Sequence, residues 1–260
     1  MISKNAIIGN KAQIGENVHI GNFTTIEDDV VIGDNTWIGN NVNILDGARI
    51  GKNCQIYPNA VISGVPQDLK YDGEYTTLEI GNNNIIREFV TINKGTISKQ
   101  KTTIGNNNLL MANAHIGHDC SIGNHCIIGF SVGMAGEVIV GNWVNISGLT
   151  GIHQFSVIGD HCMIGGLSKI TKDIPPYIIA AREPLSYEGI NVVGLKRRGF
   201  VSEKIDELKE IYRIIFQEKK NTTLALEYIE NNFKQTKERD EILFFIKKST
   251  RGIIKGNYYR

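Results

Sequence analysis

The sequence has no long apolar run, little net charge and few prolines. Its 260 residues include 5 Pro and 4 Cys, and the formal net charge is +1. A membrane-spanning helix needs about 20 consecutive apolar residues, and no stretch approaches that length; the first residues, Met1 to Asn5, form no apolar signal region. A near-neutral chain of this kind favours neither a nucleic-acid binder nor a disordered tail. We therefore expect a soluble, cytoplasmic protein with no integral membrane segment and no nucleic-acid partner.

The small net charge hides an asymmetry between the two ends of the chain. Residues 196–260 carry 16 Lys and Arg against 10 Asp and Glu, whereas residues 1–195 carry 12 against 17. A basic end on a mildly acidic body suits an acidic partner that docks near the C-terminus. A solvated helical surface explains the same charges equally well.

A six-residue repeat runs through two-thirds of the chain. An aliphatic residue returns every six positions from Ile8 to Ile62, from Ile80 to Ile92 and from Ile104 to Ile170. A small side chain lies two residues before each aliphatic, and Gly and Asn or Asp often follow it. Period-two alternation predicts short strands with one buried face, and Gly and Asn supply corners because both tolerate positive φ. We predict a mainly β prism with three flat sides and 18 residues per coil, in which each coil buries its aliphatics on the next.

All four cysteines fall on the small-residue position of this repeat. They are Cys54, Cys120, Cys126 and Cys162. Free cysteine commonly replaces Ala or Val in a core. We therefore interpret these residues as buried thiols, as neither disulfides nor metal ligands, in keeping with a cytosolic protein.

Two polar segments interrupt the repeat, and a helical pattern ends the chain. Residues 63–79 and 93–103 are expected to be external loops, which are often functional. The repeat stops after Ile170, and an apolar stripe of helical period begins near Ser202, a good N-cap. Two further helices are expected around residues 224–233 and 242–246. We assign residues 1–190 to the prism and 191–260 to a C-terminal α-helical bundle.

The repeat phase turns sequence spacing into position, because residues 18 apart lie one above another, about 4.8 Å apart. Three outward columns stand out: His118, Gly136 and Gln154; Gly117, Ala135 and His153; Asp119, Glu137 and Phe155. A histidine beside a carboxylate suits general-base chemistry near neutral pH. A bare glycine one coil away can present a backbone N–H to an oxyanion. The alternatives are a surface histidine without a role and an ordinary corner glycine.

The repeat resembles the left-handed parallel β-helix of hexapeptide-repeat transferases, which implies a homotrimer with active sites between neighbouring prisms. The gamma-class carbonic anhydrases share this prism and bind zinc through histidines. Zinc would need three nitrogen ligands. Since His115 and His118 leave one coil and His153 lies two coils away, a third ligand would have to come from another subunit.

Motifs outside the repeat phase resemble those of acyl-carrier-protein-dependent UDP-N-acetylglucosamine O-acyltransferases, which start lipid A synthesis. The resemblance spans the full length. Its motifs are residues 66–71 (PQDLKY), 113–120 (NAHIGHDC), 152–155 (IHQF), 173–177 (DIPPY), 194–200 (GLKRRGF) and 249–252 (STRG).

The resemblance implies that His118 is the general base for the glucosamine 3-hydroxyl, supported by Asp119, and that Gly136 is the oxyanion glycine. It also implies transfer of an (R)-3-hydroxyacyl group from acyl carrier protein to UDP-N-acetylglucosamine. No metal or free cofactor is implied, since the acyl group arrives on the phosphopantetheine of the carrier. The implied substrate contacts are Gln67, Asp68, Lys70, His115, Glu137, His153, Gln154, Asn191, Arg197 and Arg198, with Gly166 gauging acyl-chain length.

Two residues depart from the family pattern. Glu137 stands where the family often has histidine, and Val193 replaces a polar residue often seen near the uracil. Both leave open a 3-amino sugar nucleotide as acceptor, whose product would be an amide. The related N-acyltransferase of the pathway carries an additional N-terminal domain, whereas here the repeat begins by Ile8. A non-enzymatic trimeric scaffold gives no reason for the outward His118–Asp119 pair.

Overall fold

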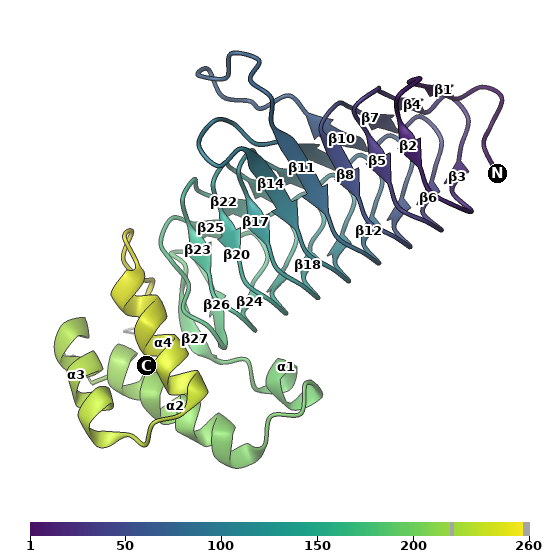
Figure 1. The fold of residues 1–260 in the computed structure, drawn as a ribbon. Coiled ribbons are helices and arrows are strands. Elements are labelled where there is room, and N and C mark those ends of the chain that lie inside the picture. The colour runs from purple at the N-terminus through teal and green to yellow at the C-terminus, as the bar shows by residue number, and fades with distance from the viewer. Residues whose placement is uncertain (219–220, 257–260) are drawn as a thin grey trace.

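The computed structural model describes residues 1–218 and 221–256, and it shows a three-sided prism of short parallel strands capped by helices (Figure 1). We number the three sheets I to III. Sheet I contains β1 (Ile7–Ile8), β4 (Thr25–Ile26), β7 (Asn43–Ile44), β10 (Val61–Gly64), β13 (Thr91–Asn93), β16 (His115–Ile116), β19 (Gly133–Met134), β22 (Gly151–Ile152) and β25 (Lys169–Ile170). Sheet II contains β2 (Gln13–Ile14), β5 (Val31–Ile32), β8 (Ala48–Ile50), β11 (Thr77–Ile80), β14 (Lys101–Ile104), β17 (Ser121–Ile122), β20 (Ile139–Val140) and β23 (Val157–Ile158).

Sheet III continues beyond the repeat. Its strands are β3 (His19–Ile20), β6 (Trp37–Ile38), β9 (Gln55–Ile56), β12 (Ile85–Ile86), β15 (Leu109–Leu110), β18 (Ile127–Ile128), β21 (Asn145–Ile146), β24 (Met163–Ile164), β26 (Ile178–Ala181), β27 (Ser186–Ile190) and β28 (Lys255–Gly256). The antiparallel hairpin β26–β27 and the returning strand β28 were not predicted from the sequence. The six-residue period gives no sign of them.

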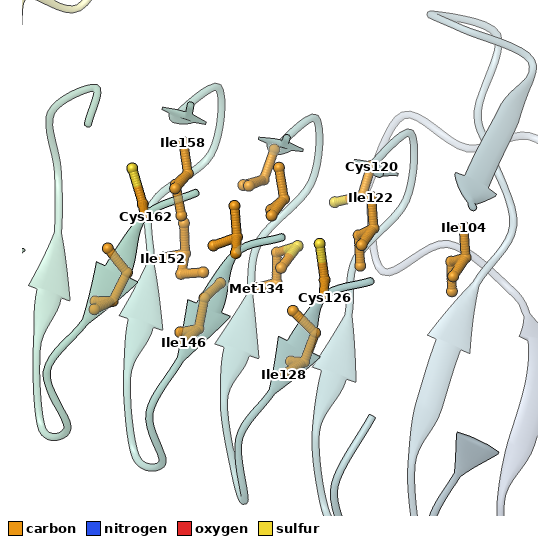
Figure 2. Close-up of a cluster of buried hydrophobic side chains, with 14 of the residues drawn as sticks. Ile104, Cys120, Ile122, Cys126, Ile128, Met134, Ile146, Ile152, Ile158 and Cys162 are labelled. Carbon is orange, nitrogen blue, oxygen red and sulfur yellow. The ribbon is translucent and has the colours of Figure 1, made fainter. Parts of the chain in front are cut away.

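The register is the 18-residue stacking that the repeat predicts. His115 pairs with Gly133, and Gly133 with Gly151. The aliphatics of the repeat point inward and, from Ile20 to Ile170, are almost wholly buried, so a continuous column of apolar side chains fills the prism (Figure 2). The four cysteines are free and buried in this column, as predicted. Burial raises the pKa of the Cys120 thiol to about 12, so these thiols stay protonated and unreactive.

The corner between sheets II and III carries a ladder of polar side chains. Asn106 N donates to Asn124 Oδ1 (2.7 Å), Asn124 N to Asn142 Oδ1 (2.9 Å), and Asn142 N to Asp160 Oδ1 (2.8 Å). Each side chain thus satisfies a corner N–H of the coil before it, a group that the parallel strands leave unpaired. The repeated Asn in the sequence therefore has a structural function at this corner.

Among the described residues, four helices lie at the C-terminal end of the prism (Figure 1). They are α1 (Val192–Arg197), α2 (Ser202–Phe216), α3 (Thr222–Asn232) and α4 (Lys237–Lys248). The mainly β fold with a helical end is confirmed, but two details of the prediction were wrong. Ser202 is the first residue of α2, and its N-cap is Val201, which offers no side-chain cap. The short helix α1, capped by the side chain of Asn191, was missed. No described helix has the length and apolar character of a membrane span.

An aromatic stack joins the helical end to the prism. The rings of His125 and Trp143 lie 3.9 Å apart, and the ring of His161 stacks on Tyr177 at 5.5 Å. These residues occupy the corner between sheets II and III, next to the asparagine ladder. Phe200, just after α1, packs edge-on against His161. Burial, and to a lesser extent the nearby Arg198 guanidinium, lowers the pKa of His161 to about 4.

Removing one member of the ladder should destabilise the prism. Asn124→Ala leaves Asn106 N without its acceptor, and we expect a loss of about 1–2 kcal/mol in the free energy of unfolding. Urea denaturation followed by circular dichroism measures it. Asn124→Asp keeps the acceptor for Asn106 N but removes the Nδ2 donor to Asn142 Oδ1 (2.9 Å), so it should lose only part of this stability. If the alanine variant is as stable as the wild type, a water molecule replaces the Asn124 acceptor without any change in the free energy of unfolding.

His161 should make the stability of the protein depend on pH. An unfolded histidine titrates near pH 6.5, whereas in the folded protein the pKa of His161 is about 4. The unfolded state therefore binds the proton more readily, and the stability contributed by neutral His161 is complete above pH 6.5 and is lost as the pH falls towards 4. We expect the melting temperature of the wild type to fall relative to that of His161→Phe, which keeps a ring in the stack, over this interval. Parallel melting curves would contradict this.

Candidate active site

His118 and Asp119 form the corner between β16 and β17, where sheet I turns into sheet II. Asp119 has the positive φ of a corner residue, 59°. His118 Nδ1 lies 2.8 Å from Asp119 Oδ2. This contact fixes the ring, since the carboxylate favours a proton on Nδ1 and leaves Nε2 free to accept one.

The pair lies outside the prism, as the repeat phase predicts, but it is not exposed. His118 and Asp119 are only 7% and 1% exposed. The segment between β13 and β14, residues 94–100, covers them; we call it the second loop. Thr96 donates to Asp119 from both N (3.0 Å) and Oγ1 (2.7 Å), and Lys99 N donates to the same carboxylate (3.2 Å). The second loop therefore buries a pair that the repeat phase places on the outside of the prism.

Gly136 lies directly against the imidazole of His118. A Cβ at residue 136 would be 2.4 Å from His118 Nε2 and 2.5 Å from Cε1. Any side chain here would overlap the ring, so the position of His118 requires glycine. Among the described residues the Gly136 N–H has no hydrogen-bond acceptor, unlike the capped corner amides of the asparagine ladder. It is a free donor next to the imidazole.

The segment between β10 and β11, residues 65–76, approaches the same ring; we call it the first loop. Asp68 Oδ2 lies 3.9 Å from His118 Nε2, beyond hydrogen-bond distance. Lys70 N donates to Asp68 Oδ1 (2.9 Å), so a local turn orients this carboxylate. The side chains of Gln67 and Lys70 are exposed. Both loops are shorter than the interruptions 63–79 and 93–103, because the flanking strands extend into them.

A hollow of ≈330 Å³ runs along the outer face of sheet I beside the pair. His115 and His153 line it, with Gly133 and Gly151 between them. His115 Nδ1 lies 2.7 Å from Thr91 Oγ1, and burial lowers the pKa of His115. His153 is exposed, and its Nδ1 lies 3.0 Å from the backbone oxygen of the half-buried Gln154.

The carboxylate of Glu137 is directed to the second loop. Ser98 Oγ donates to Glu137 Oε1 (3.0 Å), and Lys99 Nζ lies 3.5 Å from Oε2. Thr96, Ser98 and Lys99 were not singled out from the sequence. The sequence did hold one indication of their position. The interruption follows a strand of sheet I, as His118 does, so its residues lie at the same corner of the prism.

The remaining predicted residues lie at other corners of the same chain. Gly166 forms the corner between β24 and β25, where sheet III turns into sheet I. Asn191 donates from Nδ2 to the backbone oxygen of His161 (2.9 Å), and Arg198 lies over the Trp143 ring with its guanidinium carbon 5.1 Å from the centroid, both at the corner between sheets II and III. Arg197 is exposed on α1. One chain therefore does not bring these residues to His118.

No group of three His, Cys, Asp or Glu side chains in the described parts of the chain is placed to hold one metal ion. The site is built from a hydrogen-bonded histidine and carboxylate, a bare amide and two covering loops.

Comparison with known proteins identifies the family. A family model for the bacterial transferase hexapeptide, six repeats, matches residues 29–64 and 101–136. The model for domain 2 of the UDP-N-acetylglucosamine O-acyltransferases matches residues 173–254.

Curated relatives carry the name acyl-[acyl-carrier-protein]–UDP-N-acetylglucosamine O-acyltransferase. The protein from Burkholderia lata is 48% identical over 159 residues, which cover 61% of each chain. The protein from Burkholderia mallei is 42% identical over 205 residues, which cover 75% of this chain and 77% of its own.

Solved structures agree over nearly the whole length. The UDP-N-acetylglucosamine acyltransferase of Bacteroides fragilis is 52% identical, with a TM-score of 0.97, and the match covers 98% of this chain and 100% of that one. The enzyme of Francisella novicida is 37% identical, with a TM-score of 0.96 over 99% and 95% of the two chains. The chain therefore belongs to the family of UDP-N-acetylglucosamine O-acyltransferases.

Proposed function

We propose that the protein transfers an (R)-3-hydroxyacyl group from acyl carrier protein to the glucosamine 3-hydroxyl of UDP-N-acetylglucosamine, the first step of lipid A biosynthesis. The observation that carries this is the buried His118–Asp119 pair with the free Gly136 amide against its ring. Acyl transfer to an alcohol needs a base for the hydroxyl and a donor for the oxyanion. The names of the relatives supply the substrates.

The chemistry needs one proton shuttle. Neutral His118 accepts the proton of the sugar 3-hydroxyl on Nε2 while the oxygen attacks the thioester carbonyl carbon. The tetrahedral intermediate carries its negative charge on the former carbonyl oxygen, where the Gly136 N–H donates to it. Collapse breaks the carbon–sulfur bond, and the pantetheine thiolate takes the proton back from His118. The products are the 3-O-acyl sugar nucleotide and the carrier with a free thiol, with no metal or free cofactor in any step.

Asp119 positions the base. Its carboxylate holds the Nδ1 side of the ring and stabilises the imidazolium that forms transiently. Three donors from the second loop compensate its charge in a buried place, as a buried carboxylate requires.

The acceptor sugar binds in the hollow on sheet I and under the first loop. We assign its contacts to His115, His153 and Gln154 on the prism and to Asp68 and Lys70 on the loop. The nearness of Asp68 to His118 Nε2, 3.9 Å, supports this, because a hydroxyl between them contacts both. Gln67 lies on the same exposed turn of the first loop.

The nucleotide and the acyl chain require a second subunit. Asn191, Arg197 and Arg198 lie at one corner of the prism and Gly166 at another, whereas His118 lies at the third. We propose a homotrimer in which these residues face the His118 of a neighbour. An arginine suits a diphosphate, and the bare Gly166 leaves room for a long acyl chain. In this arrangement residues 1–190 form the catalytic prism, and the helices α1 to α4 lie against its end, with β28 returning to sheet III.

Removing the base should abolish transfer without changing the fold. For His118→Ala we expect kcat to fall about 10²–10⁴-fold, measured with UDP-N-acetylglucosamine and 3-hydroxyacyl carrier proteins of several chain lengths. His19→Ala, on the first coil of sheet III, is the control and should keep its activity. Size-exclusion chromatography verifies that the assembly is intact.

Two outcomes would contradict this. Undiminished turnover by His118→Ala would remove His118 from the reaction. A wild type inactive on every chain length with this acceptor, but active on the 3-amino sugar nucleotide, would make the product an amide.

The carrier should dock through the basic residues in the last turn of α1. Arg197→Ala removes an exposed positive charge, and we expect the KM for acyl carrier protein to rise about two- to fivefold at low salt and less at high salt, as for a screened surface pair. Arg213→Ala is the matched control, because that guanidinium is paired with Glu210 and Glu218 within the chain. An effect of Arg197→Ala that does not depend on salt would count against electrostatic docking.

A further inference from the structure

A single turn of the second loop, residues 96–99, is held by carboxylates from three separate segments. Asp119 accepts hydrogen bonds from Thr96 and from Lys99 N. Ile97 N donates to Glu74 Oε1 of the first loop (2.9 Å). Glu137, from the next coil, holds the outer side of the same turn.

Glu137 contacts the turn with both carboxylate oxygens. Oε1 accepts from Ser98 Oγ (3.0 Å), and Oε2 lies 3.5 Å from Lys99 Nζ. The Glu137 side chain is only 17% exposed, which strengthens these contacts relative to a solvated ion pair. Its backbone is also fixed to the site, because Glu137 N donates to the carbonyl oxygen of His118 (2.8 Å).

We propose that Glu137 is a positioning residue of the acyl transfer, which holds the 96–99 turn on Asp119 and so fixes the His118 imidazole. This inference rests on the proposed function. Asp119 Oδ2 is shared between His118 Nδ1 (2.8 Å) and Thr96 Oγ1 (2.7 Å). The carboxylate keeps its orientation towards the ring only while the turn supplies its donors. Glu137 anchors the turn through Ser98 and Lys99, whereas Glu74 of the first loop holds Ile97.

The same contacts argue against Glu137 as a contact of the acceptor sugar. A carboxylate that bound a sugar hydroxyl would need an oxygen directed into the hollow on sheet I. Both oxygens face the second loop instead, and Glu137 is absent from the residues that line the hollow. The proposed role of this residue therefore acts through Thr96 and Asp119 rather than through a contact with the sugar.

Amide hydrogen exchange and steady-state kinetics on the full-length protein test the proposal together. For Glu137→Ala we expect faster exchange of the Ile97 and Lys99 amides and a kcat about tenfold lower, the loss of one charged hydrogen bond. The KM for UDP-N-acetylglucosamine should stay within about twofold. Glu137→Gln keeps an oxygen that can accept from Ser98 Oγ and should restore part of the kcat.

The matched control is Glu79→Ala. Glu79 forms an ion pair with Lys101 (3.1 Å) between neighbouring strands of sheet II, next to the second loop but without contact to its turn. It should change neither the exchange of the turn nor kcat. Thermal unfolding of each variant separates loss of positioning from loss of fold.

The outcomes are distinct. Faster exchange with unchanged kcat makes Glu137 a structural tether only and overturns the proposal. Unchanged exchange with a raised KM means that Glu137 contacts the acceptor directly and also overturns it. A wild type without transfer activity overturns the proposed function instead, and the exchange of the turn then decides by itself whether Glu137 holds it.

Discussion

The stacking of coils at an 18-residue register is the constraint on which the rest of the structure depends. Each strand has only two to five residues, so none is stable alone. Stability arises only when the aliphatic of one coil is buried on the next and the backbone groups pair along the prism. A residue added within a repeat would move every later side chain to another face. Insertions are therefore confined to corners, where they leave the phase intact.

This constraint explains where the site lies. The first loop joins β10 to β11 and the second joins β13 to β14, so both leave the corner at which sheet I turns into sheet II. His118 lies at the same corner on the next coil, between β16 and β17. Three consecutive coils thus place the first loop, the second loop and His118 along one edge of the prism. The loops bury a histidine that the bare prism would expose.

Much of this could be predicted from the sequence, because a periodic fold encodes position in spacing. The columns of His118, Gly136 and Gln154 follow from the repeat alone. The contact of Gly136 with the imidazole does not, because it depends on the orientation of the His118 ring, which the contact with Asp119 fixes. The hairpin β26–β27 and the returning β28 were missed since they lie outside the period. The role of the polar motif at residues 66–71 came only from the family resemblance, and Thr96 was missed because one hydroxyl in a polar loop gives no pattern.

The repeated coils of the prism have a structural role, and the candidate active site lies where one corner departs from the repeat pattern. At the corner between sheets II and III, the N–H groups of Asn106, Asn124 and Asn142 are each capped by an Asn or Asp of the next coil. At the His118 corner the equivalent capping position is Gly136, which offers no side chain. The absent side chain admits the imidazole and leaves the N–H of His118, in the coil before, without the cap that the ladder supplies. The Gly136 N–H is free because Gln154, at the capping position of the next coil, does not accept from it. The carboxylates of Asp119, Glu74 and Glu137 then hold the second loop over the imidazole of His118. The His118 corner lacks an asparagine ladder, and the second loop packs over it instead. The same loop encloses the base.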